Sequence, residues 1–222
     1  MVLRIKALES GGERTLQVGH WMQLDELLTH VEVLSRSGDA RRDISGVRYD
    51  SRMVEPGSVF VAIRGQLSDG NDFVNEAVRR GAVAIVSEAG PSEADPTGDT
   101  PWIRVPSDRA ALAALAAGFF RRPTDQLNLV GITGTNGKTT TAHLVESIIK
   151  SAGHPVAILG TTDHRGPGFG QAAKLTTPEA SDLESMFRTT VDMGCRHAVM
   201  EVSSHAIELR RVEQLSFDVV AF

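Results

Sequence analysis

The chain has 222 residues, 41% of them apolar, which is enough for one large or two smaller hydrophobic cores. The formal net charge is -5 and the basic residues are scattered, so nothing in the composition indicates binding to nucleic acid or to an anionic membrane. No apolar run approaches the ~20 residues that cross a bilayer, and the amino terminus lacks the apolar core of a secretory signal, so we expect a cytoplasmic protein. Cys195, the only cysteine, is predicted to be a buried inert thiol.

The first part of the chain predicts a small α/β domain over residues 22–106. Residues 1–21 are polar and aperiodic, which predicts an extension without regular structure and makes Met22 an alternative start. The segment MQLDELLTHVEVL from Met22 predicts a short helix with Leu24, Leu27, Leu28 and Val31 on one face. The later elements are expected as a strand at 59–63, a helix at 72–80, strands at 82–86 and 102–105, and a Gly- and Pro-rich surface loop at 88–101.

The second part, residues 107–222, alternates strand and helix patterns and predicts a parallel sheet covered by helices. Ser107 is placed to cap an Ala- and Leu-rich helix that ends near Phe120, and Thr177 is placed to cap a later helix. The chain ends at Phe222, inside what we expect to be a buried strand. The predicted strands are 129–133, 156–160, 198–202 and 217–222, and the predicted helices are 138–152 and 178–193.

A glycine-rich loop joins the strand at 129–133 to the helix at 138–152, which is the context that a phosphate-binding loop requires. Its glycines let backbone N–H groups turn towards phosphate oxygens, Lys138 adds positive charge, and Thr139 is placed to ligate magnesium. A turn that only connects strand to helix is the alternative, but it has no need of Lys followed by Thr. The expected ATP-binding residues are Gly134, Thr135, Asn136, Gly137, Lys138, Thr139 and Thr140.

Glu201 lies at the carboxyl end of the strand expected at 198–202, on the edge of an α/β sheet where ligands bind. Its carboxylate is therefore a candidate magnesium ligand facing Thr139, and a capping carboxylate is the alternative. We expect Lys138 and Glu201 to be catalytic, and Thr139 and Glu201 to hold the metal. Arg211 offers a guanidinium fork that suits a carboxylate better than lysine would, although a solvated surface arginine remains possible.

Ser51 is a second candidate for ligand binding. It lies in an Asp-Ser-Arg segment and offers a hydrogen-bond donor and acceptor to a pyrophosphate. Gly65 and Gly70 further along would permit close approach of the backbone to such a ligand. Ordinary turn chemistry explains the same residues, so both interpretations stay open.

Three strings resemble the Mur ligase family. GITGTNGKTTT at 131–141 is similar to the family's nucleotide loop, including a first glycine displaced from the usual spacing by Ile132. MEVSSH at 200–205 is similar to the string that distinguishes MurE-type enzymes from the MurC, MurD and MurF types. YDSR at 49–52, followed by PGSVFVAIRGQLSDGNDF, resembles the MurE amino-terminal domain. The resemblance runs in the family's order from about Met22 to Phe222.

The resemblance implies an ATP- and Mg²⁺-dependent ligase of peptidoglycan precursor synthesis. Such an enzyme adds an amino acid to UDP-N-acetylmuramoyl-L-alanyl-D-glutamate through an acyl phosphate. The implied fold is α/β, with a small amino-terminal domain followed by a P-loop-containing parallel-sheet central domain that is incomplete at Phe222. The residues implied to contact the UDP-linked substrate are Ser51, Thr176, Thr177, Ser203 and Arg211.

In the family, a further central-domain motif and a carboxyl-terminal domain that binds the amino acid would follow Phe222. We therefore expect this chain to bind nucleotide or substrate weakly and not to ligate by itself. Another P-loop ATP-binding protein is one alternative, although it would have no reason to carry MEVSSH or the DSR segment. A non-catalytic relative that binds a nucleotide or UDP-sugar is the other.

Overall fold

A computed structural model describes residues 4–10, 13–19, 21–65, 68–91 and 98–222. The chain divides into two compact units, Met1–Ala111 and Leu112–Phe222, and each is described by itself. The division falls within helix α3 (Asp108–Phe119), a short distance after the expected boundary at Pro106. Ser107 Oγ accepts a hydrogen bond from the backbone N–H of Ala110 at 3.3 Å, as the sequence predicted for the cap of this helix.

The first unit contains a five-stranded sheet with the order β4-β9-β8-β7-β6. Strands β6 to β9 are parallel and β4 pairs antiparallel at one edge. All residues of β7 and β8 are buried, which explains why these strands are continuous apolar runs in the sequence. The strand bounds are β4 Ser35–Ser37, β6 Gly46–Arg48, β7 Ser58–Val61, β8 Ala84–Ser87 and β9 Trp102–Arg104.

Short elements complete the first unit, and two of them differ from expectation. The helix expected from Met22 is only five residues long, because the hydroxyl of Thr29 bonds back to the carbonyl of Glu26 at 2.7 Å where the helix ends. The amino-terminal extension was expected to lack regular structure, yet it pairs two strands in register. A hairpin forms by the pairing of neighbouring strands, so the lack of periodic apolar residues in this segment did not exclude it. These elements are β1 Arg4–Ser10, β2 Glu13–Gly19, β3 Met22–Gln23, α1 Leu24–Leu28, β5 Asp43–Ile44, η1 Ser51–Met53, η2 Gly70–Phe73 and α2 Val74–Arg79.

The second unit contains a six-stranded sheet with the order β13-β12-β11-β14-β10-β15. Strands β11, β14, β10 and β15 are parallel, as the alternating pattern predicted. The hairpin of β12 and β13 adds two antiparallel strands that the sequence did not predict, because Gly166 and Gly168 in a short polar stretch are typical of a loop. The bounds are β10 Asn128–Ile132, β11 Ala157–Leu159, β12 Asp163–Gly166, β13 Phe169–Ala172, β14 His197–Glu201 and β15 Val219–Ala221.

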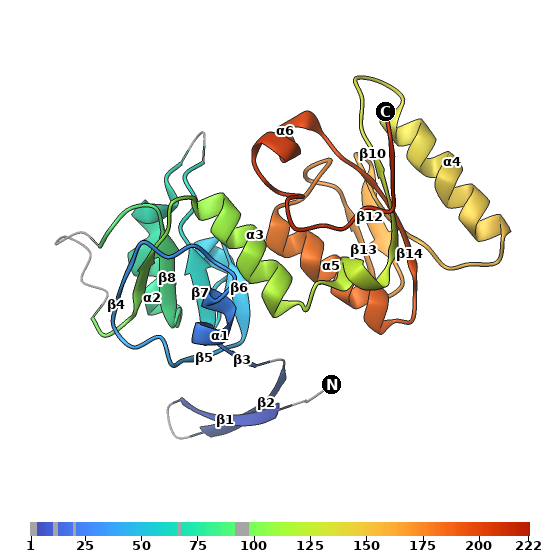
Figure 1. The fold of residues 1–222 in the computed structure, drawn as a ribbon. Coiled ribbons are helices and arrows are strands. Elements are labelled where there is room, and N and C mark those ends of the chain that lie inside the picture. Colours follow the sequence, from blue (N-terminus) through green and yellow to red (C-terminus); the bar gives the residue numbers. More distant parts are fainter. Residues whose placement is uncertain (1–3, 11–12, 20, 66–67, 92–97) are drawn as a thin grey trace. The chain divides into compact units, whose positions relative to one another are not determined.

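Two helices, α4 (Lys138–Ser151) and α5 (Ala180–Asp192), cover opposite faces of this sheet (Figure 1). Helix α5 packs a buried cluster that includes Phe187, whereas α4 packs one that includes Ala142. The remaining helical segments are η3 Pro123–Gln126 and α6 Ser204–Glu208. In the part of the chain that the structure describes, no helix combines the length and the apolarity that a membrane span requires.

The ends of α5 test the capping predictions. Gly194 has a φ of +77° just past the helix and donates its N–H to Val191 O at 2.9 Å, so glycine ends the helix there. The prediction that Thr177 is the N-cap is wrong. Glu179 holds that position, and the Thr177 hydroxyl instead donates to the backbone carbonyl of Glu201 at 2.9 Å.

The last strand also differs from expectation. The stretch 217–222 was predicted to be a buried strand, but β15 lies at the edge of the sheet, and Val219 and Val220 are 54% and 64% exposed. An apolar run identifies a strand but not whether a neighbour covers it. Cys195, by contrast, is buried as predicted.

Glu184 is a buried acid on α5. It is 1% exposed, and neither carboxylate oxygen has a hydrogen-bond partner among the described residues. Burial raises the pKa of Glu184 to about 8, while the nearby Arg122 guanidinium opposes the shift and Asp125 adds to it. The folded chain therefore favours the neutral acid at pH 7.

Replacing Glu184 by Gln should remove a pH dependence of stability. Between the ordinary glutamate pKa of about 4.3 and the raised value, the unfolded chain releases a proton that the folded chain keeps. The free energy of unfolding of the wild type should therefore fall as pH rises through this range, by on the order of a few kcal/mol, and Glu184→Gln should flatten that trend. Calorimetric melts across this pH range measure the effect. Glu208→Gln, at a side chain that is 78% exposed, is the matched control, and an unchanged slope in Glu184→Gln would contradict the assignment.

Candidate active site at the carboxyl edge of the second sheet

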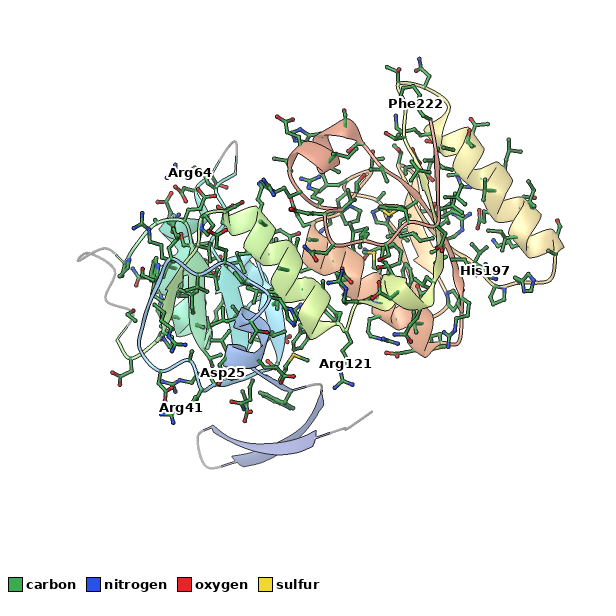
Figure 2. All side chains as sticks on the ribbon, viewed as in Figure 1. Asp25, Arg41, Arg64, Arg121, His197 and Phe222 are labelled. Carbon is green, nitrogen blue, oxygen red and sulfur yellow. The ribbon has the colours of Figure 1, made fainter. Side chains whose placement is uncertain are left out.

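Three neighbouring parallel strands deliver the candidate residues to one edge of the sheet. In the order β11-β14-β10, the strands end at Leu159, Glu201 and Ile132, and Ile132 is paired in register with Glu201. In Figure 2, His197 at the start of β14 and Phe222 just past β15 mark the amino and carboxyl edges of this sheet. The loops that follow the strands meet at the carboxyl edge, where open α/β sheets bind ligands.

The glycine-rich loop follows β10 and leads into α4. Gly134 and Gly137 have φ of +127° and +81°, a backbone region that glycine tolerates best, so these two glycines set the course of the loop. The Lys138 ammonium donates to the carbonyl of Gly134 at 2.7 Å and thus lies across the loop. Thr135, Asn136 and Thr140 are exposed, and Thr139 is half-buried.

The carboxylate of Glu201 is 1% exposed and accepts three hydrogen bonds. Oε2 accepts from Thr139 Oγ1 at 3.0 Å and from Thr161 Oγ1 at 3.1 Å. Oε1 accepts from the backbone N–H of Thr161 at 2.9 Å. The structure thus brings Thr139 and Glu201 into direct contact, as the expected metal site requires.

Gly160 leaves space for this carboxylate. A Cβ placed on Gly160 would collide with Oε1 of Glu201, and Gly160 itself is buried. The loop after β11 therefore approaches Glu201 so closely that a side chain at this position would require the carboxylate or the backbone to shift.

The oxygen atoms of Thr139 and Glu201 decide which metal ion could bind here. Thr139 and Glu201 present two oxygen donors side by side, which suit a hard cation. Within the described residues, no group of three or more His, Cys, Asp or Glu side chains could hold a metal ion. Mg²⁺ commonly takes one or two protein oxygens and completes its shell with phosphate oxygens and water, so the pair fits magnesium in that mode.

The segment 176–179 lies beside Glu201 and is fixed by its own contacts. The Thr177 hydroxyl donates to Glu201 O and accepts from the N–H of Ser203 at 3.2 Å, so its hydrogen-bonding capacity serves the fold. Ser203 caps α6, where its Oγ accepts from the N–H of Ala206 at 3.2 Å. Thr176 Oγ1 lies 3.2 Å from Thr161 Oγ1.

Arg211 is held in a buried ion pair. Its side chain is 10% exposed, Nη2 lies 2.7 Å from Glu179 Oε1, and Nη1 donates to Thr177 O at 3.0 Å. Four of the five expected substrate residues, Thr176, Thr177, Ser203 and Arg211, thus lie on connected segments of the second unit. Their contact with a substrate stays a prediction.

The fifth expected substrate residue, Ser51, belongs to the first unit. It begins η1 and is 6% exposed, and its Oγ donates to Glu76 Oε2 at 3.0 Å. This hydrogen bond, and then one from Arg80, lower the pKa of Glu76. The Asp50 side chain caps η1 by accepting from Arg52 N at 3.0 Å, so the DSR segment forms a well-defined turn.

Sequence reasoning missed Gly160, Thr161 and Glu179. Gly160 ends the predicted strand 156–160 and Thr161 follows it, so the strand-end argument that singled out Glu201 applies to them equally. Glu179 had no such signal, because an acid at the start of a helix is ordinarily explained by the helix dipole alone.

Gly160→Ala tests the close approach. The new methyl group should displace the Glu201 carboxylate or the backbone and lower the free energy of unfolding by about 1–3 kcal/mol. Gly170→Ala is the matched control, because a Cβ there meets nothing within 4 Å. Calorimetric melting of both variants measures the difference, and equal melting temperatures would show that the loop adjusts freely.

Comparison with known proteins identifies the family. The sequence matches the profile "Mur ligase family, catalytic domain" over residues 43–120 and the profile "Mur ligase middle domain" over residues 132–222. The two matches together span most of the chain.

Curated relatives match the same region. The chain is 46% identical over 201 residues to the UDP-N-acetylmuramoyl-L-alanyl-D-glutamate–2,6-diaminopimelate ligase of Geobacter sulfurreducens. It is 44% identical over 202 residues to the ligase of the same name from Bacillus licheniformis. Both matches cover 90% of this chain but only 39% and 40% of those proteins, so the chain spans about two fifths of their length.

Solved structures support the fold. A structure of a UDP-N-acetylmuramoyl-L-alanyl-D-glutamate–2,6-diaminopimelate ligase aligns with a TM-score of 0.73 at 24% identity and covers 90% of this chain and 39% of that one. MurF from Acinetobacter baumannii aligns with a TM-score of 0.58, also at 24% identity, and covers 83% of this chain and 36% of its own. The expected α/β fold is thus confirmed, with mixed sheets that contain parallel strands. With both profile matches in sequence order and this fold, the chain belongs to the Mur ligase family.

Proposed function

We propose that these residues form the UDP-substrate-binding and ATP-binding part of a ligase that adds an amino acid to UDP-N-acetylmuramoyl-L-alanyl-D-glutamate. The observation that carries the proposal is the contact between Thr139, at the start of the phosphate loop helix, and the buried Glu201 of the MEVSSH string. Mur ligases are ATP-dependent, and this contact forms a two-oxygen site beside the loop that would hold the phosphates. The proposal places the protein in the cytoplasm, where ATP is supplied.

The proposed reaction needs positioning and charge neutralisation more than a covalent protein nucleophile. The substrate's D-glutamyl carboxylate attacks the γ-phosphorus of ATP, which gives an acyl phosphate and ADP, and the amine of the amino acid then displaces phosphate. Lys138 would leave the carbonyl of Gly134 and place its charge on the β- and γ-phosphates. Thr139 and Glu201 would hold Mg²⁺, which neutralises charge on the transferring phosphoryl oxygens.

In the second unit, Thr176, Ser203 and Arg211 are proposed to contact the UDP-linked substrate. Ser51 is proposed, separately, as a substrate contact of the first unit. Arg211 is fixed by Glu179 and by the carbonyl of Thr177, and a guanidinium held in one orientation can donate its remaining N–H groups to a substrate carboxylate with little loss of side-chain entropy. The Thr177 hydroxyl is fully used within the fold, so we assign it a supporting role.

Because the chain spans about two fifths of the length of its curated relatives, we propose binding of nucleotide and UDP-substrate for these residues. The amide-forming step is proposed for a full-length ligase. A P-loop kinase acting on a small acid would explain the loop, but it would not explain the match to the Mur ligase family over residues 43–120.

Lys138→Ala tests the nucleotide part of the proposal. Calorimetric titration of the chain with Mg-ATP should give binding that Lys138→Ala weakens by at least about tenfold, since one charged contact to a phosphate contributes roughly 1.5–3 kcal/mol. Lys150→Ala is the matched control, because Lys150 lies at the end of α4 and pairs with Glu146 at 2.6 Å. Equal affinities for Lys138→Ala and Lys150→Ala would rule out the phosphate-loop assignment.

Ser51→Ala tests the substrate part. The wild-type chain should bind UDP-N-acetylmuramoyl-L-alanyl-D-glutamate, and loss of the hydroxyl should weaken that binding by roughly threefold to tenfold while leaving Mg-ATP affinity unchanged. Ser45→Ala is the control in the same unit, because Ser45 Oγ donates to Pro56 O and has no assigned role in binding. If the wild type binds ATP but not the muramoyl compound, the substrate assignment is wrong and the nucleotide assignment stands.

A further inference from the structure

A chain of hydroxyl groups connects the proposed metal site to the proposed substrate segment. Thr161 Oγ1 lies 3.1 Å from Glu201 Oε2 on one side and 3.2 Å from Thr176 Oγ1 on the other. Glu201 Oε2 is also the oxygen that accepts from Thr139. One side chain, Thr161, thus touches both the carboxylate that would bind magnesium and a residue that would contact the muramoyl peptide.

Counting protons fixes the direction of these hydrogen bonds. A threonine hydroxyl has one proton to donate and lone pairs with which to accept. The Glu201 carboxylate can only accept when ionised, so Thr161 gives its proton to Glu201. Thr161 can then only accept from Thr176, and the Thr176 proton points towards Thr161. In this state the hydroxyl of Thr176 offers a ligand lone pairs but no proton.

We propose that Thr161 is a positioning residue that makes the binding of magnesium nucleotide and of the UDP-linked substrate mutually favourable; this inference rests on the proposed function. Glu201 Oε2 has two lone pairs, and the Thr139 and Thr161 hydroxyls use both, so a cation bound there replaces one of these donors. In the proposal the replaced donor is Thr161, whose hydroxyl then turns its proton to Thr176. Thr176 then accepts from Thr161 and can donate its own proton to an anionic or carbonyl oxygen of the substrate. Occupation of the metal site thereby converts Thr176 from an acceptor into a donor.

The surroundings of Thr161 make its hydroxyl separable from its structural role. The backbone N–H of Thr161 holds Glu201 Oε1 at 2.9 Å, and this contact does not depend on the side chain. The Thr161 side chain is exposed, and the buried Glu201 Oε2 keeps its hydrogen bond from Thr139 when the Thr161 hydroxyl is removed. The neighbouring Thr162 is also exposed, and its Oγ1 donates to Asp163 Oδ1 at 3.0 Å, away from Glu201 and Thr176.

The experiment is a set of calorimetric titrations with the 222-residue chain. ADP is titrated in the absence and presence of saturating UDP-N-acetylmuramoyl-L-alanyl-D-glutamate, once with excess Mg²⁺ and once with EDTA. ADP is used because it lacks the γ-phosphate and cannot react. The ratio of the two ADP dissociation constants is the coupling factor, and linkage requires the same factor for the substrate. The variants are Thr161→Val, Thr161→Ser as the conservative replacement, and Thr162→Val as the matched control.

The wild type should show a coupling factor of at least about fivefold with Mg²⁺, the lower end of common couplings, and a factor near one with EDTA. Thr161→Val should bring the Mg²⁺ factor close to one without changing ADP affinity in EDTA, whereas Thr161→Ser and Thr162→Val should keep the wild-type factor. Wild-type coupling in Thr161→Val, or equal coupling with EDTA, would overturn the proposal. If the wild type binds ADP but not the muramoyl compound, it is the proposed function that fails, and the coupling fails with it.

Discussion

The buried carboxylate of Glu201 is the constraint on which the site depends. A carboxylate that is 1% exposed needs hydrogen-bond partners for its oxygens, and three donors supply them here, one from the start of α4 and two from the loop after β11. These donors fix the phosphate loop on one side and the loop after β11 on the other. Gly160 suits the same contact, because a Cβ there would force Oε1 or the backbone to shift. The carboxylate therefore organises the edge of the sheet.

A second set of contacts, made by Thr177 and Arg211, holds the segments next to Glu201 in place. Thr177 ties the segment before α5 to the main chain of Glu201 and to the start of α6. Arg211, which follows α6, binds the same segment through Glu179 and the carbonyl of Thr177. A guanidinium and a carboxylate that are both almost fully buried cost desolvation energy, which good geometry and further hydrogen bonds must offset. The arrangement holds Arg211 in one orientation, which is what recognition of a substrate carboxylate requires. The fold's own contacts thus hold the residues of the proposed site in place.

Much of the fold could be predicted from the sequence, because the buried strands are largely apolar and apolar residues recur at helical spacing in the helices. The buried parallel strands β7, β8, β10 and β14 are continuous apolar runs, and their positions were predicted to within a few residues. The hairpin β12–β13 was missed because its glycines are typical of a loop, and its strands exist through pairing with β11. The exposure of β15 depends on what lies beside it in the sheet, which no local pattern records.

By itself, the sequence determined the phosphate loop, the candidate metal pair and the family resemblance. A loop that binds phosphate needs glycine, lysine and threonine at fixed short spacing, and such spacing is local. Only the tertiary structure decided which hydroxyl groups and backbone groups surround Glu201. Thr139, Thr161 and Thr176 are separated along the chain and meet because parallel strands end at one edge of the sheet. Hydrogen-bond direction along that chain of hydroxyl groups is a property of their contact, since each group has one proton and its neighbours decide where it points.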